Sequence, residues 1–109
     1  MKTSSCKQKG RLLQQKVRDK ILEKFPTLEA DDVTSRSMGA QGTDILLSPK
    51  AQRLFGYDVE CKNVEKLNIW EALKQCEGNA KKNTPLLIFK RNRTEIYCTL
   101  KFDDLLKLL

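Results

Sequence analysis

The chain has 109 residues, of which 39% are apolar and 32% charged, a composition typical of one globular domain and not of a disordered segment. Its 21 lysine and arginine residues outweigh 14 acidic ones, and the resulting net charge of +7 favours a polyanionic partner such as nucleic acid, although an incidentally basic surface accounts for it equally well. The sequence contains no histidine, which excludes histidine-based triads and histidine general bases, so any catalysis must use carboxylates, lysines, hydroxyls or a bound metal.

The first predicted element is an amphipathic helix over residues 7–25. Apolar side chains recur there at every fourth position and form the stripe that such a helix buries: Leu13, Val17, Ile21 and Phe25. Pro26 ends this helix, and a polar connection leads to a short predicted strand over residues 33–37.

A strand, a short helix and a second strand are predicted next. The apolar run 45–47 follows a turn bracketed by glycines and is typical of a buried strand. Ser48 and Pro49 are typical of a helix N-cap and its first helical residue, so we expect a brief helix that ends at Gly56. Residues 57–62 are then expected to form the next strand.

The last third of the chain predicts a helix, a hairpin and a short final helix. Asn68, with Glu71 three residues later, resembles a capping box for a helix over residues 69–80. Residues 85–89 and 95–99 are typical strands joined by a turn, and the leucines after them have helical spacing. The whole order predicts a mixed α/β domain that spans residues 1–109.

The candidate chemistry lies in an isolated aspartate and a Glu-x-Lys triplet. In a strand, side chains alternate across the sheet, so Glu60 and Lys62 should share one face. Asp44, at the start of the neighbouring strand, can bring a second carboxylate to Glu60. Two carboxylates and the backbone carbonyl of Cys61 match the oxygen ligands that Mg²⁺ accepts, with Mn²⁺ able to substitute.

A metal in this position would polarise a phosphodiester and lower the pKa of a bound water, while Lys62 positions or activates that water. This is the chemistry of a hydrolytic nuclease. The competing interpretation is that the triplet is the exposed face of an edge strand with a cross-strand ion pair. The triplet alone favours that interpretation because it is common, and Asp44 after a glycine-rich turn strengthens the nuclease interpretation.

These motifs resemble those of the PD-(D/E)xK nucleases, and within them the small archaeal and phage Holliday junction resolvases. The resemblance covers nearly the whole chain and rests on Lys9-Gly10 at the opening of the first helix, Arg36-Ser37-Met38-Gly39, Gly42-Thr43-Asp44-Ile45, and Val59-Glu60-Cys61-Lys62. It implies a restriction-endonuclease-like core, in which helices flank a mixed central sheet and the elements follow the order α-β-β-β-α-β-β.

The resemblance also implies residue roles. Asp44 and Glu60 would be metal ligands, Lys62 the catalytic lysine, and Ser37 a residue near the scissile phosphate. One catalytic position departs from the pattern: four residues after the Lys-Gly pair the resolvases carry a glutamate, and this chain has Gln14. A glutamine carbonyl can bind a metal-bound water but brings no negative charge, which leaves both one and two metals open.

Several further residues are candidates for DNA contact. Gln75 lies in the helix after the Glu-x-Lys strand, where nucleases of the broader superfamily place a glutamine that faces the site, and a solvent-facing glutamine is the alternative. Trp70 is expected in a core or an interface and not against a base. The candidate phosphate-binding residues are Lys7, Lys9, Arg11, Arg36, Lys62, Lys66, Arg91 and Arg93.

The sequence thus predicts a Mg²⁺-dependent, structure-selective DNA endonuclease, and specifically a Holliday junction resolvase that cuts four-way junctions. Resolution needs two nicks related by two-fold symmetry, which predicts a homodimer. Two alternatives stay open: a nuclease with the same site that cuts flaps, nicked duplex or single strands, and a non-catalytic DNA-binding module, which Gln14 motivates.

The cysteines and the hydrophobicity pattern predict the compartment. Cys6, Cys61, Cys76 and Cys98 are widely spaced and form no C-x-x-C pair, so free thiols in a reducing cytoplasm are expected instead of a zinc finger or disulfides. No apolar run reaches membrane-spanning length or resembles a signal peptide. We expect a prokaryotic or phage-infected host cytoplasm, no membrane partner and no small-molecule cofactor.

Overall fold

The computed structural model describes residues 3–37 and 39–109. The strands are β1 (Val33–Ser35), β2 (Ile45–Leu47), β3 (Tyr57–Asn63), β4 (Thr84–Lys90) and β5 (Tyr97–Thr99). The helices are α1 (Thr3–Lys24), the 3₁₀ turn η1 (Ala30–Asp32), α2 (Pro49–Leu54), α3 (Ile69–Asn79) and α4 (Phe102–Leu108). The chain is a small unit of helices and mixed sheets, consistent with the general α/β class that the sequence predicted.

The strands form two sheets where the sequence predicted one mixed central sheet. β3 pairs in parallel with β4, which pairs with β5 as the predicted antiparallel hairpin, while β1 and β2 form a separate antiparallel pair. The sheets meet where the Asp44 N–H donates a hydrogen bond to the Val59 carbonyl (2.9 Å). β1 and β2 are short, with three residues each. The hydrogen bond between Asp44 and Val59 places the start of β2 beside the middle of β3.

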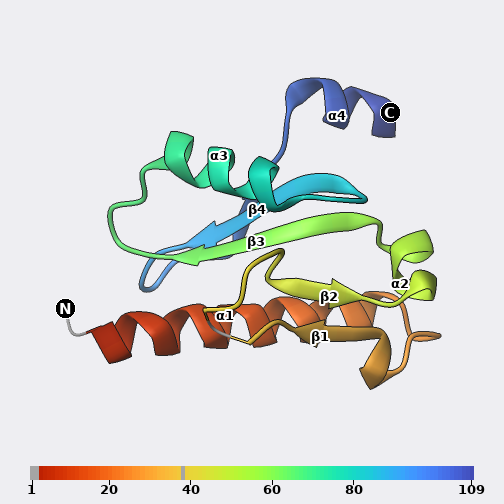
Figure 1. Ribbon diagram of the computed structural model, residues 1–109, viewed down its shortest axis with the longest axis horizontal. Helices are drawn as coiled ribbons and strands as arrows, with labels where there is room; N and C mark the ends of the chain where they lie inside the picture. Colours follow the sequence, from red (N-terminus) through yellow and green to blue (C-terminus); the bar gives the residue numbers. More distant parts are fainter. Residues whose placement is uncertain (1–2, 38) are drawn as a thin grey trace.

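Helices cover both faces of β3 and β4, with α1 on one face and α3 on the other (Figure 1). Side chains alternate along both strands, so one set packs against α1 and the other against α3. Val59 and Ile88 belong to the core on the α1 side, whereas Leu87 packs with Ala72 and Cys76 of α3. β3 therefore directs every second side chain, Glu60 included, toward α3.

Two helix caps hold the elements around this core. Ser48 Oγ accepts a hydrogen bond from the Ala51 N–H (3.1 Å) and donates one to Asp32 Oδ1 (2.7 Å), which fixes the start of α2 against η1. Asn68 Oδ1 accepts a hydrogen bond from the Glu71 N–H (3.2 Å) at the start of α3. Both predicted N-caps are confirmed.

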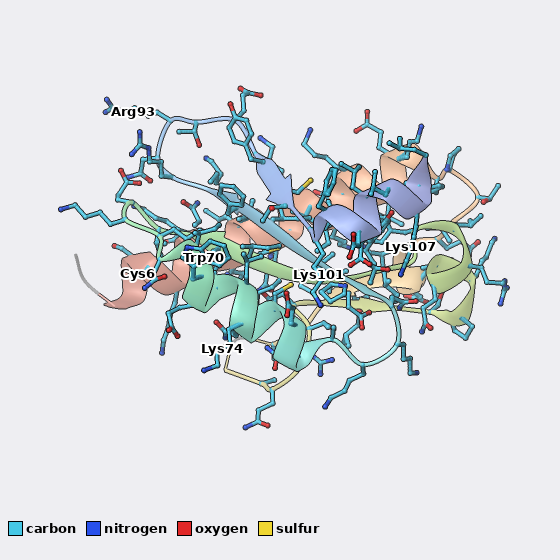
Figure 2. The ribbon with its side chains drawn as sticks, turned by 90° about the horizontal axis from the view of Figure 1, so that it is seen from above. Cys6, Trp70, Lys74, Arg93, Lys101 and Lys107 are labelled. Atoms are coloured by element: carbon cyan, nitrogen blue, oxygen red, sulfur yellow. The ribbon has the colours of Figure 1, made fainter. Side chains whose placement is uncertain are left out.

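Some predicted boundaries and placements are wrong. α1 begins at Thr3, so the Lys9-Gly10 pair lies inside the helix and does not open it. β1 ends at Ser35, because the chain then turns into the loop that carries Arg36. Trp70, expected in a core or an interface, is 77% exposed on α3, so it is no core residue of this chain and its place in an interface stays a prediction (Figure 2).

The four cysteines are free thiols, as expected. Cys61 and Cys76 are buried, whereas Cys6 and Cys98 are exposed. Burial raises the pKa of Cys76 to about 11, so this thiol is protonated at neutral pH and behaves as a small apolar core residue. Across residues 3–37 and 39–109, no helix combines the length and the hydrophobicity needed to cross a membrane.

Candidate active site

Asp44 is held from three directions at the junction of the two sheets. Its N–H donates to the Val59 carbonyl (2.9 Å), and its carbonyl accepts from the Arg36 N–H (2.8 Å). Its side-chain Oδ2 accepts from the Cys61 N–H (2.7 Å). The loop between β1 and β2 thus presents a carboxylate at the edge of β3 with its backbone and side chain both fixed.

Glu60 brings a second carboxylate from the middle of β3. It is 4% exposed and points toward α3, where Asn79 Nδ2 donates a hydrogen bond to its Oε1 (3.3 Å). The interpretation of the Glu-x-Lys triplet as an exposed strand face is therefore wrong. A buried carboxylate costs free energy unless it is paired or hydrogen-bonded, so its presence in a core strand points to a functional demand.

Lys62 follows Glu60 on the same face of β3, as the alternation predicted. Its Nζ lies 3.7 Å from Glu60 Oε2, while the Lys62 side chain is 27% exposed. Lys62 also lines an open cavity of about 570 Å³ together with Gln75 and Asn68. The ammonium group thus contacts the buried carboxylate and is accessible from solvent.

The two carboxyl groups both resist ionisation. Burial raises the pKa of Asp44, although the Cys61 N–H and the positive charge of Lys62 oppose the shift. Burial raises the pKa of Glu60 as well, and the negative charge of Asp44 adds to the shift, against Asn79 and Lys62. The ionised forms of both carboxyls are thus disfavoured, by burial and, for Glu60, by the nearby charge of Asp44. A bound cation would therefore stabilise the ionised pair.

The residues around this pair fit a hard divalent cation. Within the described part of the chain, no cluster of three or more acidic, cysteine or histidine side chains forms a metal site, and a backbone oxygen can serve as a further ligand beside the two carboxylates. The Val59 carbonyl and the Cys61 N–H both engage Asp44, and in a strand the N–H and C=O of such residues point to one side. The Cys61 carbonyl therefore faces the Asp44 edge, as the predicted ligand set requires.

Gln14 lies on the buried face of α1. It is 5% exposed and shares that face with Leu13 and Val17, which belong to the core between α1 and the strands. α1 packs against β1 and β3. Gln14, where the resolvases carry a glutamate, is thus an interior residue and not a solvent-exposed one.

The structure brings some of the other predicted residues to the site and leaves others apart. Gln75 is exposed and lines the cavity beside Lys62, and Ser37 is exposed in the β1–β2 loop directly after Arg36. Met38, the next residue of that motif, lies outside the described residues. Lys9 and Arg11 lie on the N-terminal half of α1, and none of the described hydrogen bonds joins them to Asp44 or Glu60.

Two contributing residues were missed by the sequence analysis. Asn79, which donates to Glu60, lies four residues after Gln75 and so on the same side of α3, a spacing that could have identified it. Asp58 lies two residues before Glu60 on the same face of β3 and is 9% exposed. The alternation of the strand accounts for the face on which Asp58 lies, but the groups that donate hydrogen bonds to Asp58 belong to residues 81–83, which are distant in the sequence.

Comparisons with known proteins give no relative. A scan against protein-family models found no match, and searches among curated proteins and solved structures found no similar protein. The functional argument therefore depends on the residues and geometry of the site.

Proposed function

We propose that this chain is a Mg²⁺-dependent DNA endonuclease with a restriction-endonuclease-like core of the PD-(D/E)xK type, and that it resolves Holliday junctions. The observation that carries the proposal is the placement of two carboxyls at neighbouring positions of β3: Asp44 is bound to the Cys61 N–H, and buried Glu60 has Lys62 3.7 Å away. Buried acidic pairs with raised pKa values and an adjacent lysine are typical of active sites and do little for stability.

Each residue of the site has a distinct part in phosphodiester hydrolysis. Asp44, Glu60 and the Cys61 carbonyl would hold the cation, and the Cys61 N–H keeps the Asp44 carboxylate oriented. When bound, Mg²⁺ would supply positive charge to the scissile phosphate and lower the pKa of a water molecule. Lys62 can donate a hydrogen bond to the attacking water or to the phosphate, and its charge offsets the negative charge that develops in the transition state.

The charge of the molecule supports a nucleic-acid substrate. The net charge of +7 would attract a polyanion, and the lysine at the site is open to solvent through the adjoining cavity. We further propose that the protein acts in the cytoplasm, which agrees with its four free thiols.

The wild-type protein is expected to cut a labelled four-way DNA junction in Mg²⁺ or Mn²⁺ and to leave it uncut in EDTA. A linear duplex of the same length and total charge should be cut much more slowly, because the proposal assigns selectivity to DNA shape. Equal cutting of flaps, nicked duplex or single strands would favour the related nuclease functions. Tight junction binding without any cleavage would instead favour a non-catalytic DNA-binding module, for which the missing acidic group at Gln14 is the structural argument.

Junction resolution requires paired nicks, so we propose a homodimer in which the second copy covers α4. α4 stands beyond α3 and outside the layers of the domain (Figure 1). Its large apolar side chains are exposed, with Phe102 at 70% and Leu108 at 60%. Light scattering after size exclusion should give twice the 12.6 kDa monomer mass, and Leu108→Glu should shift the protein to monomer. A wild-type monomer both with and without junction DNA would contradict this part of the proposal.

A further inference from the structure

A second cavity, with a mixed polar and apolar lining, adjoins the carboxyl pair on the side away from Lys62. It has a volume of about 200 Å³ and lies between the β1–β2 loop and the loop that joins α3 to β4. Arg36 lines it from the first loop, and Lys81 and Lys82 line it from the second. None of these three side chains takes part in the cation site described above.

Asp58 holds the α3–β4 loop in a fixed conformation. Its Oδ2 accepts hydrogen bonds from three successive backbone N–H groups, those of Lys81 (2.9 Å), Lys82 (3.0 Å) and Asn83 (3.2 Å). Its Oδ1 accepts from Asn83 Nδ2 (3.0 Å). Burial opposes ionisation of Asp58, but these hydrogen bonds outweigh it and lower its pKa, so the group is an anion that serves to position the loop.

The β1–β2 loop fixes Arg36 in a similar way. Arg36 Nε donates a hydrogen bond to the Thr43 carbonyl, and the guanidinium lies against the backbone of Gly42. A Cβ at Gly42 would come within 2.9 Å of the guanidinium, so the absence of a side chain there leaves the space that Arg36 occupies. Arg36 lines the cavity, and its outer guanidinium nitrogens, which make none of the described hydrogen bonds, are donors of the kind that bind an anion.

The charge balance in the cavity is strongly positive. Among the described residues that line it, Asp58 is the acidic one, and both of its oxygens already accept hydrogen bonds from the loop. The three cationic residues Arg36, Lys81 and Lys82 thus outnumber the acidic residue of the lining. Several cationic side chains around a small hollow are suited to a tetrahedral oxyanion with several acceptor oxygens.

The cavity lies directly beside the proposed catalytic site. Asn79 lines the cavity and donates to Glu60, and the Arg36 backbone N–H donates to the Asp44 carbonyl. Asp58 and Glu60 are two strand residues apart, roughly 7 Å. A polymer whose scissile phosphate met Asp44 and Glu60 would therefore bring a neighbouring phosphate to this cavity.

We propose that Arg36, Lys81 and Lys82 form a subsite for a DNA backbone phosphate. This phosphate is the neighbour of the scissile phosphate. The proposal rests on the nuclease function above for its choice of substrate, and it adds Lys81 and Lys82 to the binding residues. The subsite orients the strand over the carboxyl pair and takes no part in the chemical step.

The test is DNA binding in EDTA, which requires no cleavage. Lys81→Ala/Lys82→Ala should weaken the affinity for a labelled four-way junction roughly ten-fold or more at 0.1 M salt and reduce the slope of log K against log salt by about 2. The matched control, Lys20→Ala/Lys24→Ala, removes the same charge from exposed positions on α1, which covers the opposite face of β3. It should change both quantities much less. Thermal unfolding establishes that both variants are folded.

The outcomes separate the subsite from the nuclease proposal. A wild type that binds but never cuts would refute the nuclease, and the loss of affinity in the Lys81/Lys82 variant would still support the subsite. Equal losses in both double variants would show that only total charge matters and would overturn the subsite. Inorganic phosphate bound tightly by the wild type, with DNA affinity unchanged in the Lys81/Lys82 variant, would assign the cavity to a free anion and overturn it as well.

Discussion

Glu60→Gln is expected to reduce junction cleavage on the order of 10³-fold or more, while the metal-free protein remains at least as stable as the wild type. The substitution keeps the shape of the side chain and an oxygen that can accept from Asn79. It removes the charge that would hold the cation and balance Lys62. Lost activity without lost stability is the pattern that separates a catalytic carboxylate from a structural one.

The stability part of this prediction follows from the pKa shifts. Burial and the nearby Asp44 charge raise the pKa of Glu60, which means that the ionised form is disfavoured in the folded protein. A neutral amide removes that cost at pH 7. Conversely, Mg²⁺ should raise the Tm of the wild type, because it binds the folded state, and should have little effect on Glu60→Gln.

The effect on activity is measured by cleavage of a labelled junction under single-turnover conditions. The effect on stability is measured by thermal unfolding with and without Mg²⁺. Glu23→Gln is the matched control, since Glu23 is an exposed carboxylate on α1, and it should retain wild-type activity. Asp44→Asn and Lys62→Ala should resemble Glu60→Gln in activity. A folded Glu60→Gln protein that cuts as fast as the wild type would falsify the assignment of the site.

The sequence predicted the central part of this site because the relevant patterns are local. The alternation of a strand fixes which side chains share a face, so Glu60 and Lys62 were placed together and opposite Cys61. The glycine-bracketed turn before a short apolar strand placed Asp44 at a strand start. The register between neighbouring strands, which brings Asp44 to Cys61, follows from tertiary pairing and was only an expectation until the structure showed the hydrogen bond.

The residues that the sequence analysis missed depend on packing between distant elements. Asp58 has the same strand position relative to Glu60 as Lys62 has, but its function depends on backbone N–H groups of residues 81–83, which no local pattern reveals. The division of the strands into two sheets is also a tertiary outcome, since three-residue strands can end where the chain turns away. Likewise, α1 extends back to Thr3, ahead of the first residue of the apolar stripe, so the stripe alone did not mark where the helix begins.

Gln14→Glu is expected to lower the Tm of the metal-free protein and to increase the Tm rise that Mg²⁺ produces. Gln14 is 5% exposed, and an ionised carboxylate moved from water to such an interior position loses hydration, which destabilises the folded protein or makes the group take up a proton. If Gln14 occupies the position of the glutamate in the resolvases, as the resemblance implies, the new carboxylate would stand near Asp44 and Glu60. The metal-free protein would then carry three mutually repelling acids, which a cation would stabilise.

Gln15→Glu is the matched control, because it makes the same chemical change one residue along α1 at an exposed position. It should leave both the Tm and the response to Mg²⁺ close to those of the wild type. Thermal unfolding over a series of Mg²⁺ concentrations, together with junction cleavage, compares the three proteins. A Gln14→Glu protein that is destabilised but gains nothing from Mg²⁺ would show that α1 does not face the cation site, because only a carboxylate near the cation couples its burial cost to metal binding. A larger Mg²⁺ response with faster cleavage would place Gln14 at the site and show that the missing negative charge limits the activity of the natural sequence.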